Sequence, residues 1–493
     1  MASEETLPPN YSKLDKALRS IGYSFEVAIA DIIDNAIDAK AKNVLVRFVI
    51  RRDSPLDVVV YDDGSGMDEA TLREAMRFGA DVSEQLDRLG KFGLGLKLAS
   101  LSQARELRVY SLTNGKLSGR GWLEEGITRG FTSSIFNQGE CVAGLKDVAL
   151  HKKLKKTGTA VLWSRLYRVG QTHSAPDEHV QRLINRLKNY LSLAFHRFLA
   201  GGTKQVSITL DVLDAESGRV GVPVFLKPLD PFGYSTSGHK SFPAELIVGG
   251  YGEQVSMTAH IWPPNTNQPE YRLPGGANAR QGFYFYRNDR LIQGGGWNGM
   301  RETEPHSSLA RVAVDMSPTF DIEVGLDVKK IEVQLPGPLV KAIQTSHTGT
   351  DIDFKKYLSF ADIAYRSKSA LPSEIPLALG QGISKDLQRR VLRELGLKDA
   401  KKIRKLNFEW CDFNDDSLFD IDRDAHTIML NRVYRRSLLH GLSGSSTDAP
   451  VTKCLLFLLL REVFYSERLS SRVREKVEQA NRILVAAIKH ERI

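Results

Sequence analysis

Hydrophobic and polar positions recur with different periods along the 493 residues, and the changes divide the chain into three parts. Helical and strand patterns alternate over residues 1–195. Residues 196–345 begin with strand patterns and return to helical periodicity. Residues 346–493 are mixed and end in a predicted helix, where apolar residues recur every three or four positions from Leu469 to Ala487. These periods predict an α/β (α+β) chain of three domains, whose final helix packs into a core or forms a dimer surface.

The segment Ser24–Lys40 (SFEVAIADIIDNAIDAK) has helical periodicity, with isoleucines on one side and Asp31, Asp34, Asn35 and Asp38 on the other. A solvated polar face is the common explanation for such residues. However, no Lys or Arg lies on that face within helical reach, so the carboxylates repel one another without compensation. A divalent cation bound with a triphosphate would supply the missing positive charge. Asn35 can offer an oxygen to Mg²⁺, and Asp31 can orient or deprotonate a water molecule.

A strand and a tight turn follow this helix. Leu56–Tyr61 (LDVVVY) is a predicted buried strand, and the sequence DDGSGM follows it at residues 62–67. An Asp-Gly pair after a strand often forms an ordinary turn. Alternatively, Asp63 accepts a hydrogen bond from the exocyclic amine of adenine. Gly64 and Gly66 would then let a flat ring approach the backbone.

Closely spaced glycines precede another predicted helix in Leu89–Ser100 (LGKFGLGLKLAS). Such glycines allow backbone N–H groups to converge on a phosphate at the positive end of a helix. Lys91 and Lys97 add positive charge. A flexible loop is the alternative interpretation. The segment is not a Walker A motif, because no Gly-Lys-Ser/Thr follows at the required spacing.

Taken in order, these segments resemble the nucleotide-binding motifs of the Bergerat-fold (GHKL) ATPases. This superfamily includes the ATPase component of DNA gyrase, MutL-type mismatch-repair proteins, MORC proteins and the ninety-kilodalton heat-shock chaperones. The resemblance lies in residues 31–39 (DIIDNAIDA), 63–67 (DGSGM), 90–97 (GKFGLGLK) and 157–161 (TGTAV). In the last motif a threonine hydroxyl supports the adenine-binding aspartate.

The resemblance implies a first domain with helices on a mixed sheet, and ATP and Mg²⁺ as cofactors with the metal on Asn35. It assigns these residues to the nucleotide: Asn35, Asp38, Asp63, Gly64, Gly66, Met67, Gly90, Lys91, Phe92, Gly93, Leu94, Gly95, Leu96, Lys97 and Thr159.

One position departs from the family pattern. Asp31 stands where the family usually has a catalytic glutamate, and its side chain is one methylene shorter. Glu26 is not a suitable substitute, because helical geometry places it on the isoleucine side. The resemblance therefore implies ATP binding with slow hydrolysis, and Asp31 is the candidate catalytic residue.

The second domain resembles the transducer domain of gyrase-type, MutL-type and MORC-type proteins. Gln281–Ile292 (QGFYFYRNDRLI) predicts a strand that turns at Asn288 and Asp289. Phe320–Leu335 has two lysines between strand-like segments, which an ordinary edge strand would also explain. In the family a lysine of this domain reaches the γ-phosphate. The resemblance assigns that catalytic role to Lys330 first and to Lys329 second.

The formal net charge of +9 suits a polyanion partner, although a modestly basic cytosolic protein would have the same charge. The basic cluster Lys398–Lys405 is interpreted as a solvated helix face, with a nucleic-acid contact as the alternative. Three widely spaced cysteines, and no predicted signal peptide or long apolar run, indicate a reducing cytosol. A prokaryotic cytosol or nucleoid is expected.

We therefore predict an ATP-dependent switch or clamp that acts on DNA, in genome maintenance or defence against foreign DNA. ATP would close a lid at Phe78–Gly95 and bring two copies of the chain together as a homodimer. A heat-shock-type chaperone, a histidine kinase and a non-hydrolysing ATP-binding protein are the alternatives. The kinase is disfavoured, because no phospho-acceptor helix precedes the predicted nucleotide domain.

Overall fold

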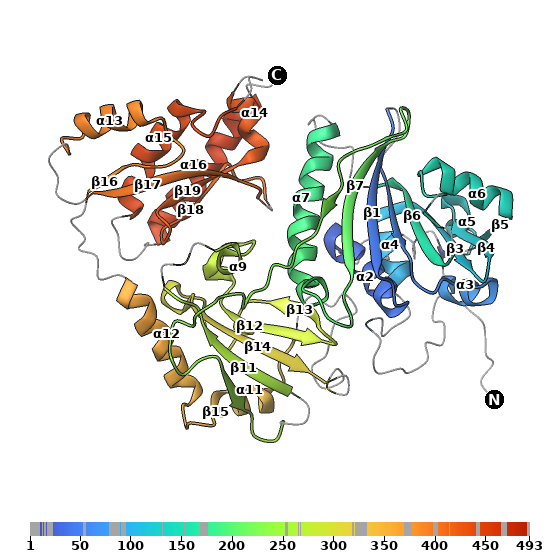
Figure 1. Cartoon of the computed structure of the whole chain (residues 1–493), viewed down its shortest axis with the longest axis horizontal. Helices are drawn as coiled ribbons and strands as arrows, with labels where there is room; N and C mark the ends of the chain where they lie inside the picture. Colours follow the sequence, from blue (N-terminus) through green and yellow to red (C-terminus); the bar gives the residue numbers. More distant parts are fainter. Residues whose placement is uncertain are drawn as a thin grey trace.

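Three α/β units follow one another along the chain (Figure 1). The computed structural model describes residues 10–490 except 12, 14, 15, 17–22, 53–55, 78–88, 90–94, 131, 152, 155, 168–175, 252–254, 265, 267, 318, 319, 321–332, 369–375, 398–402, 414, 440–443 and 465–470. Each unit has its own sheet and its own buried apolar cluster. Within these described ranges, no helix has both the length and the apolarity needed to cross a membrane.

The first sheet has nine strands in the order β5-β4-β3-β6-β2-β1-β7-β8, and β9 also pairs with β7. The sheet is mixed, because β1 and β7 are parallel while the other neighbours are antiparallel. The strands are β1 (Asn43–Ile50), β2 (Asp57–Asp62), β3 (Ala104–Thr113), β4 (Lys116–Trp122), β5 (Ser134–Phe136), β6 (Gly158–Leu166), β7 (Ser207–Asp214), β8 (Arg219–Val220) and β9 (Val224–Phe225).

Helices lie on both faces of this sheet. Side chains of α2, α4 and α7 share one core with Val58 and Val60 of β2, whereas Val59 and Tyr61 face a second cluster that includes α6. Strand side chains alternate in this way between the two faces of a sheet. The helices are α2 (Phe25–Asp38), α3 (Glu69–Met76), α4 (Gly95–Gln103), α5 (Glu124–Thr128), α6 (Gln138–Asp147), α7 (Pro176–Ala194) and α8 (His196–Leu199). The predicted fold of helices on a mixed sheet is confirmed.

The second sheet has six strands in the order β13-β12-β14-β11-β10-β15. Its predicted hairpin is confirmed, because β12 and β13 are joined by Asn288 and Asp289, which have φ of 48° and 70°. The elements are β10 (Ala244–Ile247), β11 (Val255–Ile261), α9 (Pro269–Arg272), α10 (Gly276–Ala279), β12 (Gly282–Arg287), β13 (Arg290–Gly294), η1 (Pro305–Ser307), β14 (Ala310–Met316), α11 (Gly337–Gln344), β15 (His347–Thr348) and α12 (Phe354–Lys368).

The third unit has a four-stranded sheet in the order β16-β17-β19-β18. In its final helix, Val477, Ala480 and Leu484 pack against the third core, so part of the apolar face predicted there belongs to the core. The elements are β16 (Leu377–Leu379), α13 (Lys385–Glu394), β17 (Arg404–Cys411), β18 (Phe419–Asp422), β19 (Thr427–Asn431), η3 (Arg432–Tyr434), α14 (Arg435–Leu438), α15 (Pro450–Leu460), η4 (Arg461–Phe464) and α16 (Ser471–His490).

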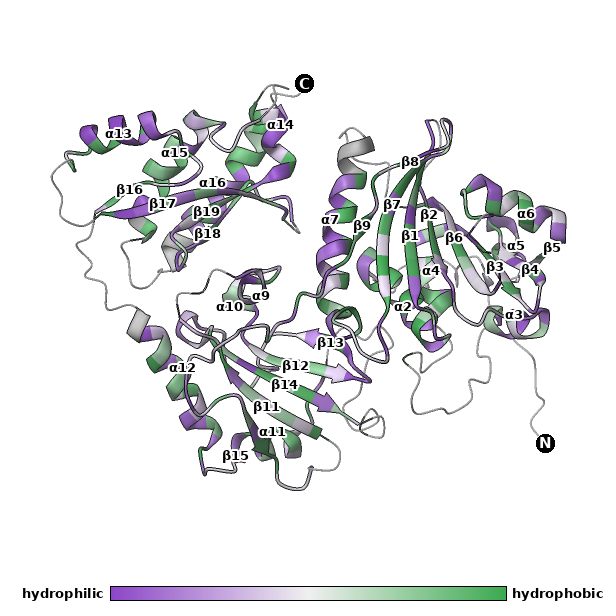
Figure 2. Ribbon diagram, in the orientation of Figure 1, coloured by the Kyte–Doolittle hydropathy of each residue, from purple (hydrophilic) through white to green (hydrophobic). Residues whose placement is uncertain are grey.

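The basic cluster Lys398–Lys405 corrects one expectation. Arg404 and Lys405 begin strand β17 and pair with β16, so they are not part of a helix face. Residues 398–402 lie outside the described part of the chain. The hydrophilic helix in this region is α13, which precedes the cluster and is largely purple in Figure 2.

Two elements cross the domain boundaries expected from the sequence. Strand β7 pairs in parallel with β1, and its Ile208 and Leu210 enter the first core, so the first sheet extends beyond residue 195. Tyr357 and Ala361 of α12 are buried in the second core, so that unit extends beyond residue 345. In both cases the apolar residues of a later segment complete the earlier core.

Candidate nucleotide-binding site

The predicted acidic helix is confirmed as α2, which begins where the Ser24 hydroxyl accepts a hydrogen bond from the N–H of Val27 at 3.3 Å. Its polar residues lie in different surroundings. Asp31 and Asp34 are buried, whereas Asn35 is exposed. Asn35 is therefore accessible to a metal ion, while neighbouring elements cover the two aspartates.

Glu26 lies near the start of the same helix and forms an ion pair with Arg186. It is buried, and its carboxylate is 2.7 Å from the guanidinium of Arg186 on α7. This placement agrees with its expected position on the apolar side of the helix.

Asp62, the last residue of β2, and Asp63, which follows it, have different surroundings. Asp62 has the same alternation as Val58 and Val60 and therefore faces the side covered by α2. It is buried, and its carboxyl group accepts hydrogen bonds from the N–H groups of Gly64 and Thr159. The carboxyl group of Asp62 thus lies where the predicted base-binding turn meets β6.

Asp63 instead caps the beginning of β1. Its Oδ1 accepts from the backbone N–H groups of Lys42 at 2.7 Å and Asn43 at 2.8 Å. Its Oδ2 accepts from the side-chain amide of Asn43 at 2.7 Å. These contacts hold both oxygens of Asp63 in a local structural role, which disfavours its predicted contact with adenine.

The glycines of the turn are required by close packing. A Cβ on Gly66, which has φ of +68°, would lie 2.1 Å from the carbonyl oxygen of Leu112. A Cβ on Gly64 would lie 2.8 Å from the carbonyl oxygen of Ala39, at the end of α2. The absence of side chains at both positions therefore lets β2, β3 and α2 approach one another.

The hydroxyl groups of Ser111 and Thr159 support this turn. The Ser111 hydroxyl on β3 lies 2.9 Å from that of Thr159 and accepts from the N–H of Met67 at 2.8 Å. Thr159 is the predicted threonine of the fourth motif. Ser111 was missed by sequence reasoning, because it belongs to no motif and only the pairing of β3 with β6 brings it here.

The glycine segment lies only partly within the described residues. Gly90, Lys91, Phe92, Gly93 and Leu94 fall outside them, as does most of the predicted lid.

Gly95, Leu96 and Lys97 form the first turn of α4. A Cβ on Gly95 would lie 3.5 Å from Oδ2 of Asp31, so the Asp31 carboxylate is next to the start of this helix. The N–H of Leu89 donates to Oδ1 of Asp38 at 2.9 Å. The acidic helix therefore contacts both ends of the glycine segment.

Two ionisable groups of the site have strongly shifted pKa values. Burial raises the pKa of Asp62 to about 7, and the neighbouring charge of Asp63 adds to this, although hydrogen bonds from Gly64 and Thr159 oppose it. Burial lowers the pKa of Lys97 to about 8, against the attraction of Glu74. Both groups can therefore exchange protons near neutral pH when a ligand changes their surroundings.

The second unit reaches the site through the β12–β13 hairpin. Nε of Arg290 is 3.0 Å from Oδ1 of Asp34, and both side chains are almost fully buried. Nη1 of Arg287 donates to the carbonyl oxygen of Leu89 at 3.5 Å. The expectation that the acidic face lacks compensation is therefore wrong, because Arg290 supplies a positive charge from 256 residues further along the chain.

Lys329 and Lys330, the predicted lysines for the γ-phosphate, lie outside the described residues. Among the described residues, no group of three or more His, Cys, Asp or Glu side chains could hold a metal ion. A magnesium ion bound by Asn35 and phosphate oxygens does not require such a group, because Mg²⁺ commonly keeps several waters and takes few protein ligands.

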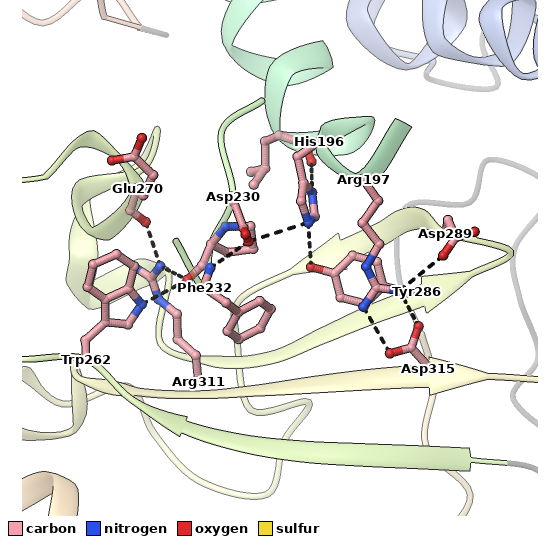
Figure 3. A network of polar contacts seen from close by, with 12 residues as sticks. His196, Arg197, Asp230, Phe232, Trp262, Glu270, Tyr286, Asp289, Arg311 and Asp315 are labelled. Atoms are coloured by element: carbon pink, nitrogen blue, oxygen red, sulfur yellow. Dashed lines mark hydrogen bonds and ion pairs between the residues drawn. The ribbon is translucent and has the colours of Figure 1, made fainter. Parts of the chain in front are cut away.

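A polar network joins the first unit to the second (Figure 3). Arg197 of α8 forms an ion pair with Asp315 of β14, and its guanidinium lies 3.6 Å from the ring centre of Tyr286. The Tyr286 hydroxyl is 3.3 Å from Nε2 of His196, whose Nδ1 is 2.8 Å from the carbonyl oxygen of Leu193. These contacts fix the end of β12 that leads into the hairpin turn against the first unit.

Residues 23–133 match the family described as histidine kinase-, DNA gyrase B-, and HSP90-like ATPase. These residues include α2, the β2 turn and the start of α4. The first unit is therefore a GHKL-type ATPase domain, as its fold and motifs predict.

MORC proteins are distant homologues of this domain. The chain is 28% identical over 88 residues to Protein MICRORCHIDIA 6 and 31% identical over 88 residues to Protein MICRORCHIDIA 2, both of Arabidopsis thaliana. It is 29% identical over 121 residues to ATPase morc-1 of Caenorhabditis elegans. The matches cover 17%, 17% and 22% of this chain, but 13%, 14% and 14% of the respective relatives.

Among solved structures, the chain is similar to one titled "Crystal Structure of N terminal domain of a DNA repair protein". The TM-score is 0.40 at 13% sequence identity, and the match covers 73% of this chain and 100% of that chain.

Proposed function

We propose that this chain is an ATP-dependent conformational switch, which binds Mg-ATP in its first unit and hydrolyses it slowly. The observation that carries the proposal is the convergence of three elements from separate parts of the sequence. The acidic helix α2, the buried carboxyl group of Asp62 and the first turn of α4 lie together on one side of the first sheet.

In this proposal Asp62, rather than Asp63, accepts the hydrogen bond from the exocyclic amine of adenine. Asp62 faces the α2 side and is supported by Thr159, whereas Asp63 is held by Lys42 and Asn43. A buried carboxylate is a strong acceptor, because a hydrogen bond to a charged group is stronger than one between neutral groups. The Asp62 site therefore fits a donor group on a flat ring.

The triphosphate would lie between the end of β2 and the first turn of α4. Asn35 would bind Mg²⁺, and Gly95, Leu96 and Lys97 would face the phosphates with the residues at 90–94. Helix N-termini and lysines both favour anions. Asp31 would orient the attacking water. Its position beside Gly95 supports this role for the shorter side chain, because the carboxylate already lies at the start of α4.

A lysine from residues 329–330 remains our proposed contact to the γ-phosphate, with Lys330 preferred. Such a contact would distinguish ATP from ADP, because ADP lacks the group that it binds. ATP would then close residues 78–95 over the nucleotide and bring two copies of the chain together.

Action on DNA, in genome maintenance or defence, is part of the same proposal. The net charge of +9 suits a polyanion, and the relatives of the ATPase domain are MORC proteins. The expected cytosolic or nucleoid location belongs to this proposal as well.

The experiment is a measurement of ATP binding and turnover by the full chain, with Mg²⁺ or EDTA and with or without duplex DNA. We expect Mg²⁺-dependent binding, slow turnover that DNA increases, and a shift to dimers with a non-hydrolysable ATP analogue. Asp31→Ala should abolish turnover while nucleotide binding remains. Absence of Mg²⁺-dependent ATP binding would refute the proposal, and unchanged turnover in Asp31→Ala would remove Asp31 from the mechanism.

A further inference from the structure

Two arginines at the tip of the β12–β13 hairpin belong to the second unit but contact the first. Arg287 and Arg290 flank the two turn residues, and both are buried, at 6% and 3% exposure. Exposed hairpin tips are usually solvated, so two buried guanidinium groups at this tip require a specific environment. The first unit supplies it.

Arg290 is held by several contacts at once. Its Nε pairs with Asp34 at 3.0 Å, its Nη1 donates to the carbonyl oxygen of Leu291, and its guanidinium lies 4.3 Å from the ring centre of Phe195. Burial alone would lower the pKa of Arg290, but the charge of Asp34, a hydrogen bond with Tyr190 and the charge of Asp31 raise it. The side chain is therefore a fixed positive charge against the acidic helix.

Asp34 has a particular place on that helix. It directly precedes Asn35, the proposed magnesium ligand, and follows Asp31 by three residues, which is one helical turn. A contact that fixes Asp34 therefore also fixes how α2 is rotated about its axis and how far it lies along that axis. It thereby sets the positions of Asn35, which would bind the magnesium ion, and Asp31, which would orient the attacking water.

Arg287, at the same hairpin tip, also contacts the first unit. It donates to the carbonyl oxygen of Leu89, whose N–H donates to Asp38 on the last turn of α2. The hairpin tip thus contacts α2 and the residue just before Gly90. By contrast, the Asp62 site is built from β2, β3 and β6, and the hydrogen bonds that support it come from the first unit alone.

We propose that Arg290 is a positioning residue for ATP hydrolysis: acting through Asp34, it holds α2 so that Asp31 and Asn35 face the terminal phosphate. This inference rests on the proposed function and adds a route from the second unit to α2 that is distinct from the proposed contact of Lys329 or Lys330. Because the Asp62 site does not depend on the hairpin, loss of Arg290 affects turnover much more than nucleotide affinity.

The test compares three variants of the full chain with the wild type: Arg290→Lys, Arg290→Met, and the double variant Asp34→Asn with Arg290→Met. The double variant should still fold, because it removes both buried charges and leaves neither without its partner. Arg272→Met is the matched control. Arg272 is another arginine of the second unit, with 18% of its side chain exposed, and it pairs with Asp422 of the third unit at 2.8 Å.

The measurements are the ATP dissociation constant, the single-turnover rate with Mg²⁺, and the thermal midpoint. We expect the double variant to keep its thermal midpoint and to bind ATP within about three-fold of wild type, while turnover falls by about ten-fold or more. Arg290→Lys should restore part of the rate, because it returns the charge without the planar guanidinium. Arg272→Met should leave the rate unchanged.

Wild-type turnover in the double variant would overturn the role of Arg290 and leave the proposed function standing. An equal loss of rate in Arg272→Met would also overturn it, since any contact between units would then have the same effect. A wild-type chain without ATP turnover would overturn both the inference and the hydrolysis on which it rests.

Discussion

Replacing Asp62 with asparagine should change both the strength and the pH dependence of adenine nucleotide binding. The adenine amine is a donor, so it forms its stronger hydrogen bond with the ionised carboxylate, and the pKa of Asp62 is raised by burial from 3.8 to about 7. Since the folded apo protein holds this proton at lower pH, nucleotide binding favours its release. Affinity should therefore fall as the pH falls below 7.

The magnitude follows from the fraction of ionised Asp62. With a pKa near 7, about nine-tenths is ionised at pH 8 and about one-tenth at pH 6. The dissociation constant of wild type should therefore rise between these two values by up to about ten-fold, the limit for binding by the ionised form alone. In Asp62→Asn this dependence should disappear. At pH 8 the affinity should be lower by about five-fold, since a charge-assisted hydrogen bond becomes a neutral one that is weaker by about 1 kcal/mol.

The assay is a titration with a fluorescent ATP analogue at several pH values, at constant ionic strength and with excess Mg²⁺. Asp63→Asn is the matched control, because it removes the adjacent charge from a residue whose oxygens are held by Lys42 and Asn43. It should keep a steep pH dependence. If Asp63→Asn abolishes the pH dependence and Asp62→Asn keeps it, the assignment of the two aspartates is reversed.

Three further changes test other parts of the structure. Gly66→Ala should destabilise the chain by about 2–3 kcal/mol in urea unfolding, because the new Cβ meets the carbonyl oxygen of Leu112 at 2.1 Å and φ is +68°; an unchanged midpoint would contradict this geometry. At pH 8.5, ATP binding should take up about 0.7 proton, because phosphate returns the charge to Lys97, whose pKa burial lowers to about 8; calorimetry in buffers of different ionisation enthalpy measures this uptake, and Lys97→Met should lack it. Arg47→Met should cost about 3–5 kcal/mol in unfolding free energy, because it leaves Asp211 buried at the β1–β7 pair; a loss below about 1 kcal/mol would refute that reasoning.

Local patterns were sufficient to predict the elements that carry the site. The period of α2, the buried strand before the turn and the hairpin at Asn288 each depend on residues close in sequence. Strand alternation could also have distinguished the two aspartates. Val58 and Val60 face α2, α4 and α7, so Asp62 must face the same side.

Contacts between distant segments could not be read in the same way. The parallel pairing of β7 with β1, the hydroxyl contact of Ser111 with Thr159, and the ion pair of Arg290 with Asp34 each depend on how separate elements pack. No periodicity or motif links such residues, because their proximity arises only when the sheets form and the hairpin docks.

The Arg290–Asp34 ion pair has a practical consequence for dissecting the molecule. A polypeptide ending at residue 133, where the family match ends, would lack both β6 and the arginine that neutralises Asp34. Burying that carboxylate alone is unfavourable, so the isolated piece should unfold more readily or rearrange its acidic helix. Biochemistry on such a piece would then report on a distorted pocket. Quantitative work on the nucleotide therefore calls for the first two units on one polypeptide.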